Sequence, residues 1–179
     1  MRGPQRLEPE HVENAIGVPE GRLNMRPEQP DDEAFRFALF CNSRPAEFAL
    51  LHLDAAGFEQ LMRMQFHGQN VTYRANFPDA RFDIIELDGK PVGRIVVNRP
   101  GDHVHIVDQA IVPELRNRGL GTAIMRRLMT EAAASAQPVR LKVASTNDPS
   151  MRLYARLGFV PIHDDPLYIE MEWRAADGG

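Results

Sequence analysis

The spacing of apolar positions changes near Pro78, from a helical repeat before it to a strand-like repeat after it. Two helices are predicted in the first part. One begins at Pro30, with acidic residues in its opening turn, and ends before Pro45. The other begins near Asp54, a good helix cap, and its apolar residues fall on one face. Those residues are Phe58, Leu61, Met62 and Phe66. A short strand is expected at 23–26.

Runs rich in β-branched residues follow Pro78, at 82–87, 93–98 and 103–112. Turn sequences at 88–89 and 100–102 separate them, so an antiparallel meander is predicted. Helices and strands then alternate. They are expected at 120–136, 139–145, 149–157 and 167–173, with a loop at 160–167. This order indicates a mixed α/β (α+β) sheet.

The chain length of 179 residues indicates one domain, at 23–175, after a loosely ordered N-terminal arm at 1–22. A net charge of −4 gives no overall attraction to nucleic acid or to anionic membranes. Cys41 is the single cysteine, which excludes an intrachain disulfide and a cysteine metal cluster. No segment resembles a signal peptide or a membrane span. We therefore expect a cytoplasmic protein with neither nucleic acid nor a membrane as its partner.

A glycine-rich turn separates the strand that ends at Val112 from the helix that begins near residue 120. It reads Arg116-Asn117-Arg118-Gly119-Leu120-Gly121-Thr122. Glycines permit positive φ and let a ligand approach the bare backbone. The first amides of a helix have no intrahelical partner and lie at the positive end of its dipole. The turn therefore suits an anion, and Arg116 and Arg118 would add positive charge.

Two familiar phosphate-binding motifs do not fit this turn. The P-loop needs a lysine after its glycines, and none follows here. The dinucleotide fingerprint needs a third glycine where this chain has Ile124. An Arg-x-x-Gly-x-Gly pattern from Arg116 to Gly121 remains. On these residues alone, a strand-to-helix turn without a ligand stays the alternative.

The turn resembles the pyrophosphate loop of the GNAT superfamily of acyl-CoA-dependent N-acyltransferases, which carries Gln/Arg-x-x-Gly-x-Gly/Ala after a strand. Residues 147–159, NDPSMRLYARLGF, resemble a second block of that family, Asn-x-x-Ala-x-x-Leu-Tyr-x-x-x-Gly-Phe. In this block we expect Asp148 to cap a helix and Gly158 to close it. The resemblance covers 80–173 closely, and 23–78 by the order of elements. It implies a GNAT-type fold, with a splayed parallel strand pair after the meander and helices on both faces.

The resemblance also implies acetyl-CoA as co-substrate and no metal. The cofactor would lie between the strands at 104–112 and 139–145. Its implied contacts are Ile111, Val112, Arg116, Asn117, Arg118, Gly119, Leu120, Gly121, Thr122, Asn147 and Tyr154. Loop amides would hold the pyrophosphate, and backbone groups of Ile111 and Val112 would pair with the pantetheine. Tyr154 matches the residue that protonates the leaving sulfur.

The general base is less clear from the sequence. Many members of the family carry a glutamate where this chain has Val107. Asp108 is adjacent, and His105 lies earlier on the same strand; a one-residue bulge would turn either side chain toward the cleft. As the general base, Asp108 is the first candidate, His105 the second and a water molecule the third. The alternative for Asp108 is a structural role in a salt bridge. His103 and His105 alternate like a metal pair but lack a third ligand at a suitable spacing.

We therefore expect an N-acetyltransferase that moves an acetyl or similar acyl group to a primary amine by direct attack in a ternary complex. The acceptor would be a small molecule or a peptide. An acyl-CoA-binding sensor or assembly module without turnover is the alternative, because of Val107. An apolar wall and the acidic 160–167 loop would receive the acceptor, and the loop favours a cationic amine. The wall would consist of Phe58, Met62, Phe66, Tyr73 and Phe77. Homodimers are common in the family.

Overall fold

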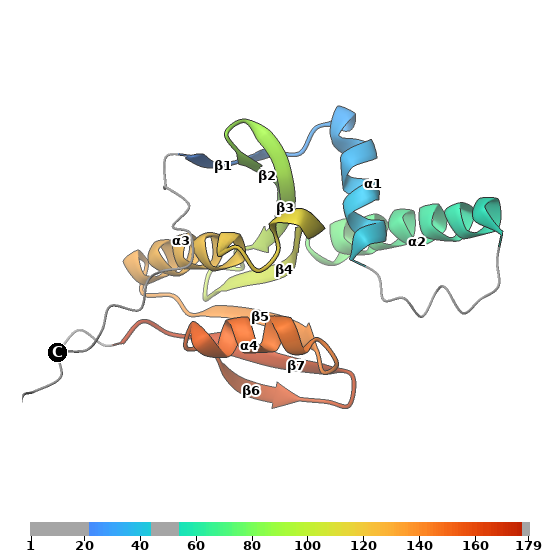
Figure 1. Cartoon of the computed structure of the whole chain (residues 1–179). Helices are drawn as coiled ribbons and strands as arrows, with labels where there is room; N and C mark the ends of the chain where they lie inside the picture. Colours follow the sequence, from blue (N-terminus) through green and yellow to red (C-terminus); the bar gives the residue numbers. More distant parts are fainter. Residues whose placement is uncertain (1–21, 44–53, 177–179) are drawn as a thin grey trace, which may run out of the picture.

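The computed structural model describes residues 22–43 and 54–176 (Figure 1). Its elements are β1 (Leu23–Pro27), η2 (Pro30–Asp32), α1 (Glu33–Asn42), α2 (Ala55–Asn76), β2 (Arg81–Leu87), β3 (Lys90–Asn98), β4 (Val104–Ile111), η4 (Pro113–Leu115), α3 (Leu120–Ala134), β5 (Val139–Ala144), α4 (Asp148–Arg156), β6 (Val160–Asp164) and β7 (Tyr168–Trp173). The expected arm at 1–22, except for Arg22, and the helix-ending Pro45 lie outside the described residues.

One seven-stranded mixed sheet organises these elements, in the order β1-β2-β3-β4-β5-β7-β6. The predicted meander is present, because β2 pairs with β3 and β3 with β4 in antiparallel registers. β4 and β5 form the parallel pair. The predicted mixed α/β class is therefore confirmed.

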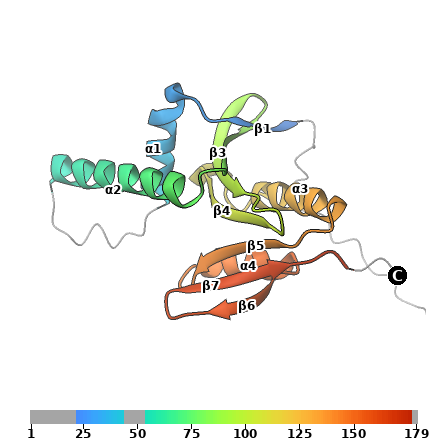
Figure 2. The same cartoon turned by 180° about the vertical axis from the view of Figure 1, so that it is seen from behind.

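Helices α3 and α4 cover one face of the sheet, and Figure 2 shows α4 behind strands β5 and β7. The apolar stripe of α3 is buried against the sheet, as its spacing predicted. Its buried residues are Leu120, Ile124, Met125, Leu128 and Ala132. We call this side the α3 face. The α2 face is the opposite side, where Phe77 at the end of α2 stacks on His105 of β4.

A separate small core joins α1 to α2 and corrects the predicted acceptor wall. Phe40, Met62 and Phe66 are buried together, and Met62 is 0% exposed. These two helices need their apolar stripes to pack against each other, so Met62 and Phe66 are unable to face a ligand. Tyr73 and Phe77 remain half-buried at the surface. As predicted, Asp54 caps α2, because its carboxylate accepts a hydrogen bond from the Gly57 amide at 2.8 Å.

The β6–β7 hairpin and the start of α4 differ from the sequence prediction. Residues 160–164 form an edge strand rather than a loop, paired with β7. All five residues of β6 are exposed, so no buried face left an alternating pattern in the sequence. Asp165 binds the turn amides of Leu167 and Tyr168, both at 2.8 Å, which holds the pKa of that carboxyl below its ordinary value. Asn147, and not Asp148, caps α4.

Among the helices of the described residues, none combines the length and the apolar character that a bilayer span requires.

Candidate active site

The parallel strands β4 and β5 separate soon after they begin. Their register pairs Val104 with Val139, His105 with Arg140, and Ile106 with Leu141. The described strands show no further pairs, although β4 continues to Ile111 and β5 to Ala144. Beyond Ile106 the two strands are therefore no longer paired, and we call this unpaired stretch the β4–β5 gap. The predicted splayed pair is present.

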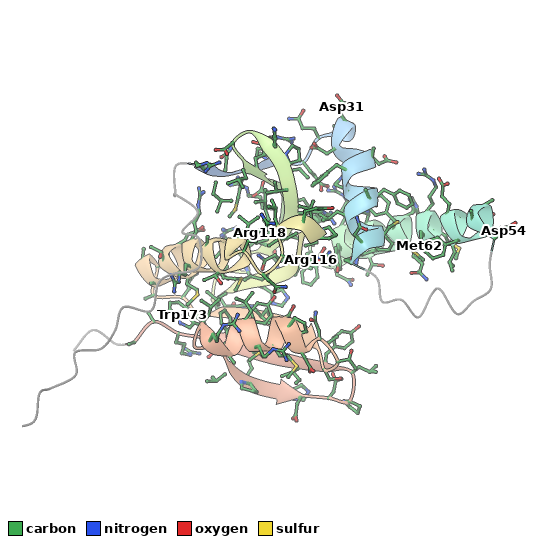
Figure 3. All side chains as sticks on the ribbon, viewed as in Figure 1. Asp31, Asp54, Met62, Arg116, Arg118 and Trp173 are labelled. Carbon is green, nitrogen blue, oxygen red and sulfur yellow. The ribbon has the colours of Figure 1, made fainter. Side chains whose placement is uncertain are left out.

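A groove of about 1290 Å³ lies on the α3 face, beside the β4–β5 gap. Its walls are the last residues of β4, the glycine-rich loop, the first turns of α3, and α4. Of the residues implied as cofactor contacts, it is lined by Ile111, Arg116, Asn117, Gly119, Gly121, Thr122, Asn147 and Tyr154. Val112, Arg118 and Leu120 do not line it, and Leu120 is buried in the core. Figure 3 labels Arg116 and Arg118 on the loop.

The loop backbone leaves the start of α3 open to an anion. Gly119 is the N-cap residue with φ of 82°, and Asn117 has φ of 59°. Both values are left-handed, a region that glycine and asparagine adopt more readily than other residues. No side chain in the described part of the chain caps this helix. Its first amides therefore retain their hydrogen-bonding capacity at the positive end of the dipole.

Arg116 holds the loop in place through two backbone carbonyls. Its Nε donates to the carbonyl of Ile111 at 3.0 Å, and Nη2 donates to the carbonyl of Asn42 at the end of α1 at 3.1 Å. The amide of Val112 donates to the Val92 carbonyl on β3 at 3.0 Å. Successive residues of a strand direct their backbone groups to alternate sides, so Ile111 directs its own toward the β4–β5 gap.

Gln109 is a groove residue that the sequence analysis did not single out. Its Nε2 atom is buried without a hydrogen-bond partner in the described structure, and Arg36 Nε is the other such side-chain atom there. A Cβ added at Gly121 would lie 4.0 Å from that amide and 3.4 Å from Leu153. Buried amide groups normally have partners, so this one fits a groove that receives a polar ligand. Locating it required the strand register, which the sequence does not give.

A β-bulge at Val107 decides which side chains of β4 share a face. Val96 of β3 pairs with Asp108 and Val97 pairs with Ile106, which leaves Val107 as the extra residue. An extra residue shifts the alternation of side chains by one position. His105 and Asp108 therefore both lie on the α2 face, whereas Gln109 lies on the α3 face with the groove.

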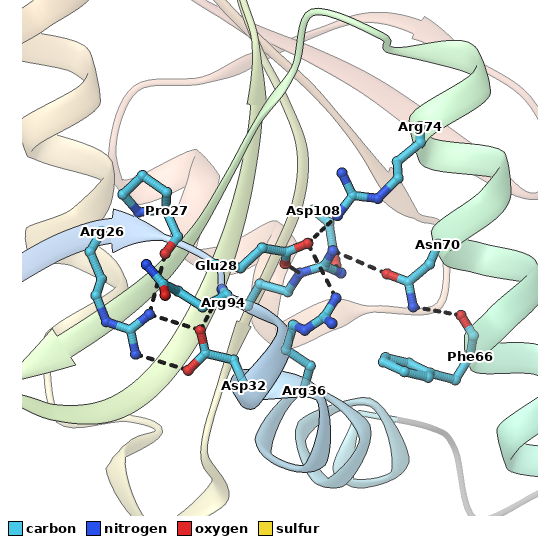
Figure 4. A network of polar contacts seen from close by, with 11 residues as sticks. Arg26, Pro27, Glu28, Asp32, Arg36, Phe66, Asn70, Arg74, Arg94 and Asp108 are labelled. Carbon is cyan, nitrogen blue, oxygen red and sulfur yellow. Dashed lines mark hydrogen bonds and ion pairs between the residues drawn. The ribbon is translucent and has the colours of Figure 1, made fainter.

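Two charged or titratable groups of β4 lie on the α2 face, Asp108 beside the gap and His105 where β4 is still paired with β5. Asp108 is 28% exposed, and its Oδ2 lies 3.9 Å from Nη1 of the buried Arg94 (Figure 4). The His105 ring stacks on Phe77 with 5.5 Å between centroids. Burial lowers the pKa of His105, and the neighbouring His103 lowers it further. His105 is therefore a neutral imidazole near neutral pH.

Tyr154 lines the groove from α4 and packs against Phe159, with 5.7 Å between ring centroids. Burial raises the pKa of Tyr154 to about 12, and the negative charge of Asp108 acts in the same direction. The phenol therefore keeps its proton at neutral and mildly alkaline pH. A protonated hydroxyl beside the groove can donate a proton but is not suited to accept one.

The described histidines do not form a metal site with other residues. The rings of His103 and His105 lie 5.9 Å apart, and His103 Nδ1 lies 2.8 Å from the Asp102 carboxylate. Within residues 22–43 and 54–176, no three His, Cys, Asp or Glu side chains gather as metal ligands would.

Comparison with known proteins identifies this architecture. The sequence model of the acetyltransferase (GNAT) family matches residues 48–159, more than half of the chain. The chain belongs to the GNAT family. The predicted superfamily is thereby confirmed.

Individual GNAT proteins resemble this chain at modest identity. An uncharacterized N-acetyltransferase of Methanocaldococcus jannaschii is 31% identical over 91 residues, which are 50% of this chain and 58% of that protein. The chain thus aligns with little more than half the length of this relative.

Three solved structures share the GNAT fold over nearly their whole length. The PaiA N-acetyltransferase of Thermoplasma acidophilum, solved with coenzyme A, has a TM-score of 0.64 at 16% identity, covering 86% of this chain and 99% of that one. An acetyltransferase of Thermus thermophilus has a TM-score of 0.63 at 20% identity, covering 89% of this chain and 100% of that one. The ribosomal-protein-S18-alanine N-acetyltransferase of Escherichia coli has a TM-score of 0.58 at 16% identity, covering 88% of this chain and 96% of that one. These likenesses show the fold alone.

Proposed function

We propose that this GNAT chain transfers an acetyl or similar acyl group from acetyl-CoA to a primary amine. The β4–β5 gap is the observation that carries the proposal, because the unpaired end of β4 has Gln109 and Ile111 at the groove and Asp108 on the α2 face. A cofactor in the groove and an acceptor on the α2 face would meet there, in a ternary complex. Such positioning by itself supplies a large part of the rate in acyl transfer.

The groove residues fit acetyl-CoA in three respects. Uncapped amides at the start of α3 suit the pyrophosphate. The backbone of Ile111 faces the gap, and its amide would donate to the pantetheine as in an added strand, while its carbonyl accepts from Arg116. Asn147 uses its Oδ1 to accept the Ser150 amide of α4 at 3.3 Å, which leaves its side-chain amide nitrogen to donate. Gln109 Nε2 would donate as well.

Bound acetyl-CoA would supply the activated thioester, and the chain would handle the protons. The amine nitrogen attacks the thioester carbonyl carbon and the carbon–sulfur bond breaks. Asp108 accepts the proton that the amine loses, with His105 second and water third in rank. Tyr154 donates its phenolic proton to the departing sulfur, which suits a hydroxyl that stays protonated.

The proposed reaction requires an amine as the acceptor, and the protein surface adds little about which amine it is. A neighbour in fold from Escherichia coli is named as acting on an alanine of ribosomal protein S18, which supports a peptide amine as well as a small-molecule amine. The acidic hairpin gives less support for a cationic acceptor than expected, because Asp165 is bound to its own turn.

Calorimetry with acetyl-CoA, followed by thiol release with a panel of small and peptide amines, tests the proposal. We expect tight binding and turnover with at least one class of amine. Tight binding without turnover would instead identify an acyl-CoA sensor or assembly module. Failure to bind acetyl-CoA would contradict both functions.

A further inference from the structure

Arg94 is a buried residue of β3 whose guanidinium contacts three segments of the α2 face (Figure 4). Its Nε donates to Glu28 Oε2 at 3.1 Å, and its Nη2 donates to Asn70 Oδ1 on α2 at 3.2 Å. Nη1 lies 3.9 Å from Asp108 Oδ2, and the side chain is 5% exposed. Two hydrogen bonds thus fix the guanidinium while its remaining nitrogen is directed at the candidate base.

Glu28 does not neutralise all of the positive charge around it. Its carboxylate is 7% exposed and also accepts from Arg36 at 3.2 Å and from Arg74. Among the residues that the structure describes, three arginines therefore contact this one glutamate. Positive charge remains for Asp108, and an adjacent positive charge favours the ionised form of a carboxyl group.

We propose that Arg94 is a positioning residue for acyl transfer, which keeps the Asp108 carboxylate ionised and oriented at the β4–β5 gap. The inference rests on the proposed function, in which Asp108 accepts the proton of the amine. Because Asn70 belongs to α2, the same guanidinium ties this carboxylate to the helix beside the expected acceptor site. Without Arg94, Asp108 would become protonated at a higher pH and would hold its orientation less well.

Charged and titratable groups from every neighbouring element set the field at this site. They are Arg94 on β3, Glu28 before η2, Arg36 on α1, Arg74 on α2, His105 on β4 and Tyr154 on α4, with His103 before β4, Arg140 and Lys142 on β5 and Glu170 on β7 acting on His105. Of these, Arg94 forms the ion pair with Asp108 and is the residue to change.

The test compares Arg94→Met, which removes the charge, with Arg94→Lys, which keeps it without the planar fork. For each variant, kcat and KM are measured against pH with the best amine, and acetyl-CoA affinity is measured by calorimetry. In Arg94→Met, we expect the acidic limb of kcat to move upward by about one to three pH units, the usual effect of an arginine on a carboxyl group. Acetyl-CoA affinity should not change. Arg94→Lys should return the limb to its wild-type position with a lower kcat.

Arg74→Gln is the matched control, because it removes another partner of Glu28 and leaves the Arg94–Asp108 pair in place. Its acidic limb should coincide with that of the wild type. If Asp108→Asn abolishes the limb while Arg94→Met leaves it unmoved, Arg94 has no such role and the proposed function stands. Full activity of Asp108→Asn would overturn the inference together with the choice of base. A wild type without turnover on any amine contradicts the proposed function itself.

A second variant keeps the inference open to test if Arg94→Met does not fold. Asn70→Ala releases one anchor of the guanidinium and keeps the charge. We expect a several-fold lower kcat with the acidic limb and the acetyl-CoA affinity unchanged. A kcat equal to that of the wild type would rule out the positioning role.

Discussion

Tyr154 and Asp108 approach the β4–β5 gap from opposite faces of the sheet, and the charge of Asp108 helps burial to raise the pKa of Tyr154 to about 12. In the proposed mechanism the two groups would move protons in opposite directions. Tyr154 would donate a proton to the leaving sulfur, and Asp108, whose carboxylate lies 3.9 Å from Arg94, would accept one from the amine.

Replacing Tyr154 by phenylalanine removes the proton donor and keeps the ring that packs against Phe159. We expect kcat to fall by about 10²–10⁴-fold, the usual worth of a positioned acid. The dissociation constant of acetyl-CoA should stay within a few-fold of the wild-type value. Steady-state kinetics and calorimetry measure the two quantities. Unchanged kcat would remove Tyr154 from the mechanism.

The ranking of the two candidate bases can be tested by comparing Asp108→Asn with His105→Gln. Asp108→Asn should lower kcat more, since the Phe77 ring covers one face of the His105 ring. The measurement is kcat over the range from pH 5 to pH 9, with amine in excess. A larger loss in His105→Gln would reverse the ranking, and similar small losses in both would favour water as the proton acceptor.

Gln109→Leu should separate stability from cofactor binding. The substitution replaces a buried amide nitrogen without a described partner by an apolar group, so the midpoint of thermal unfolding should rise or stay level. Acetyl-CoA affinity should fall by about 2- to 10-fold, the worth of one hydrogen bond. Gln109→Asn, which keeps an amide but shortens it, is the control. Unaltered affinity in Gln109→Leu would show that this amide does not contact the cofactor.

Gly121, in the first turn of α3, lies close to Leu153 of α4 and Ile111 of β4. An added Cβ would sit 3.4 Å from Leu153 Cδ2 and 3.6 Å from Ile111 Cδ1. We expect Gly121→Ala to retain most of the acetyl-CoA affinity, whereas Gly121→Val should abolish binding because its methyl groups displace both side chains. Calorimetry and circular dichroism check binding and fold.

Gly68→Val on α2 is the matched control, since nothing lies within 4 Å of a Cβ there. It should bind acetyl-CoA like the wild type. If Gly121→Val and Gly68→Val bound acetyl-CoA with equal affinity, the glycine-rich loop would not take part in binding the cofactor.

Asp32 stabilises the junction between β1 and α1 in a pH-dependent way. Its carboxylate accepts two hydrogen bonds from Arg26, both at 2.8 Å, and these contribute most to lowering its pKa from 3.8 to about 2. A lowered pKa stabilises the fold above the ordinary value of 3.8, and this stabilisation is lost as the pH falls toward about 2.

Asp32→Asn should therefore lower the free energy of unfolding at neutral pH by about 1.5–3 kcal/mol, the worth of hydrogen bonds to a charged group. Urea unfolding at several pH values measures the difference. The difference in free energy of unfolding between variant and wild type should disappear as the pH approaches 2. If this difference were the same at every pH, the charge of Asp32 would not contribute to stability.

Much of the fold was predictable because it follows from local rules. The α3 stripe, the Asp54 cap and the hairpin turns depend on residues close together in sequence. The loop and the block at 147–159 were also accessible as contiguous motifs. Their residues now line one groove.

The remaining features depend on partners far apart in the chain. The position of the Val107 bulge is a property of the register with β3, and periodicity alone does not locate it. The Arg94 cluster unites residues 28, 36, 70, 74 and 108, which no local pattern connects. The exposed strand β6 has no buried face to generate a signal, and Pro161 is typical of an edge strand.

The shortness of the β4–β5 register has a mechanical consequence. Three residue pairs join strands β1 to β4 to the unit of β5, β7 and β6, so this seam is the weakest joint of the sheet in backbone bonding. A ligand that bonds to the backbone of Ile111 and rests against α4 would bridge the two halves at the place where strand pairing is missing. Binding of the ligand would then also make the joint between β4 and β5 more rigid. This would be measured as slower amide hydrogen exchange in both strands.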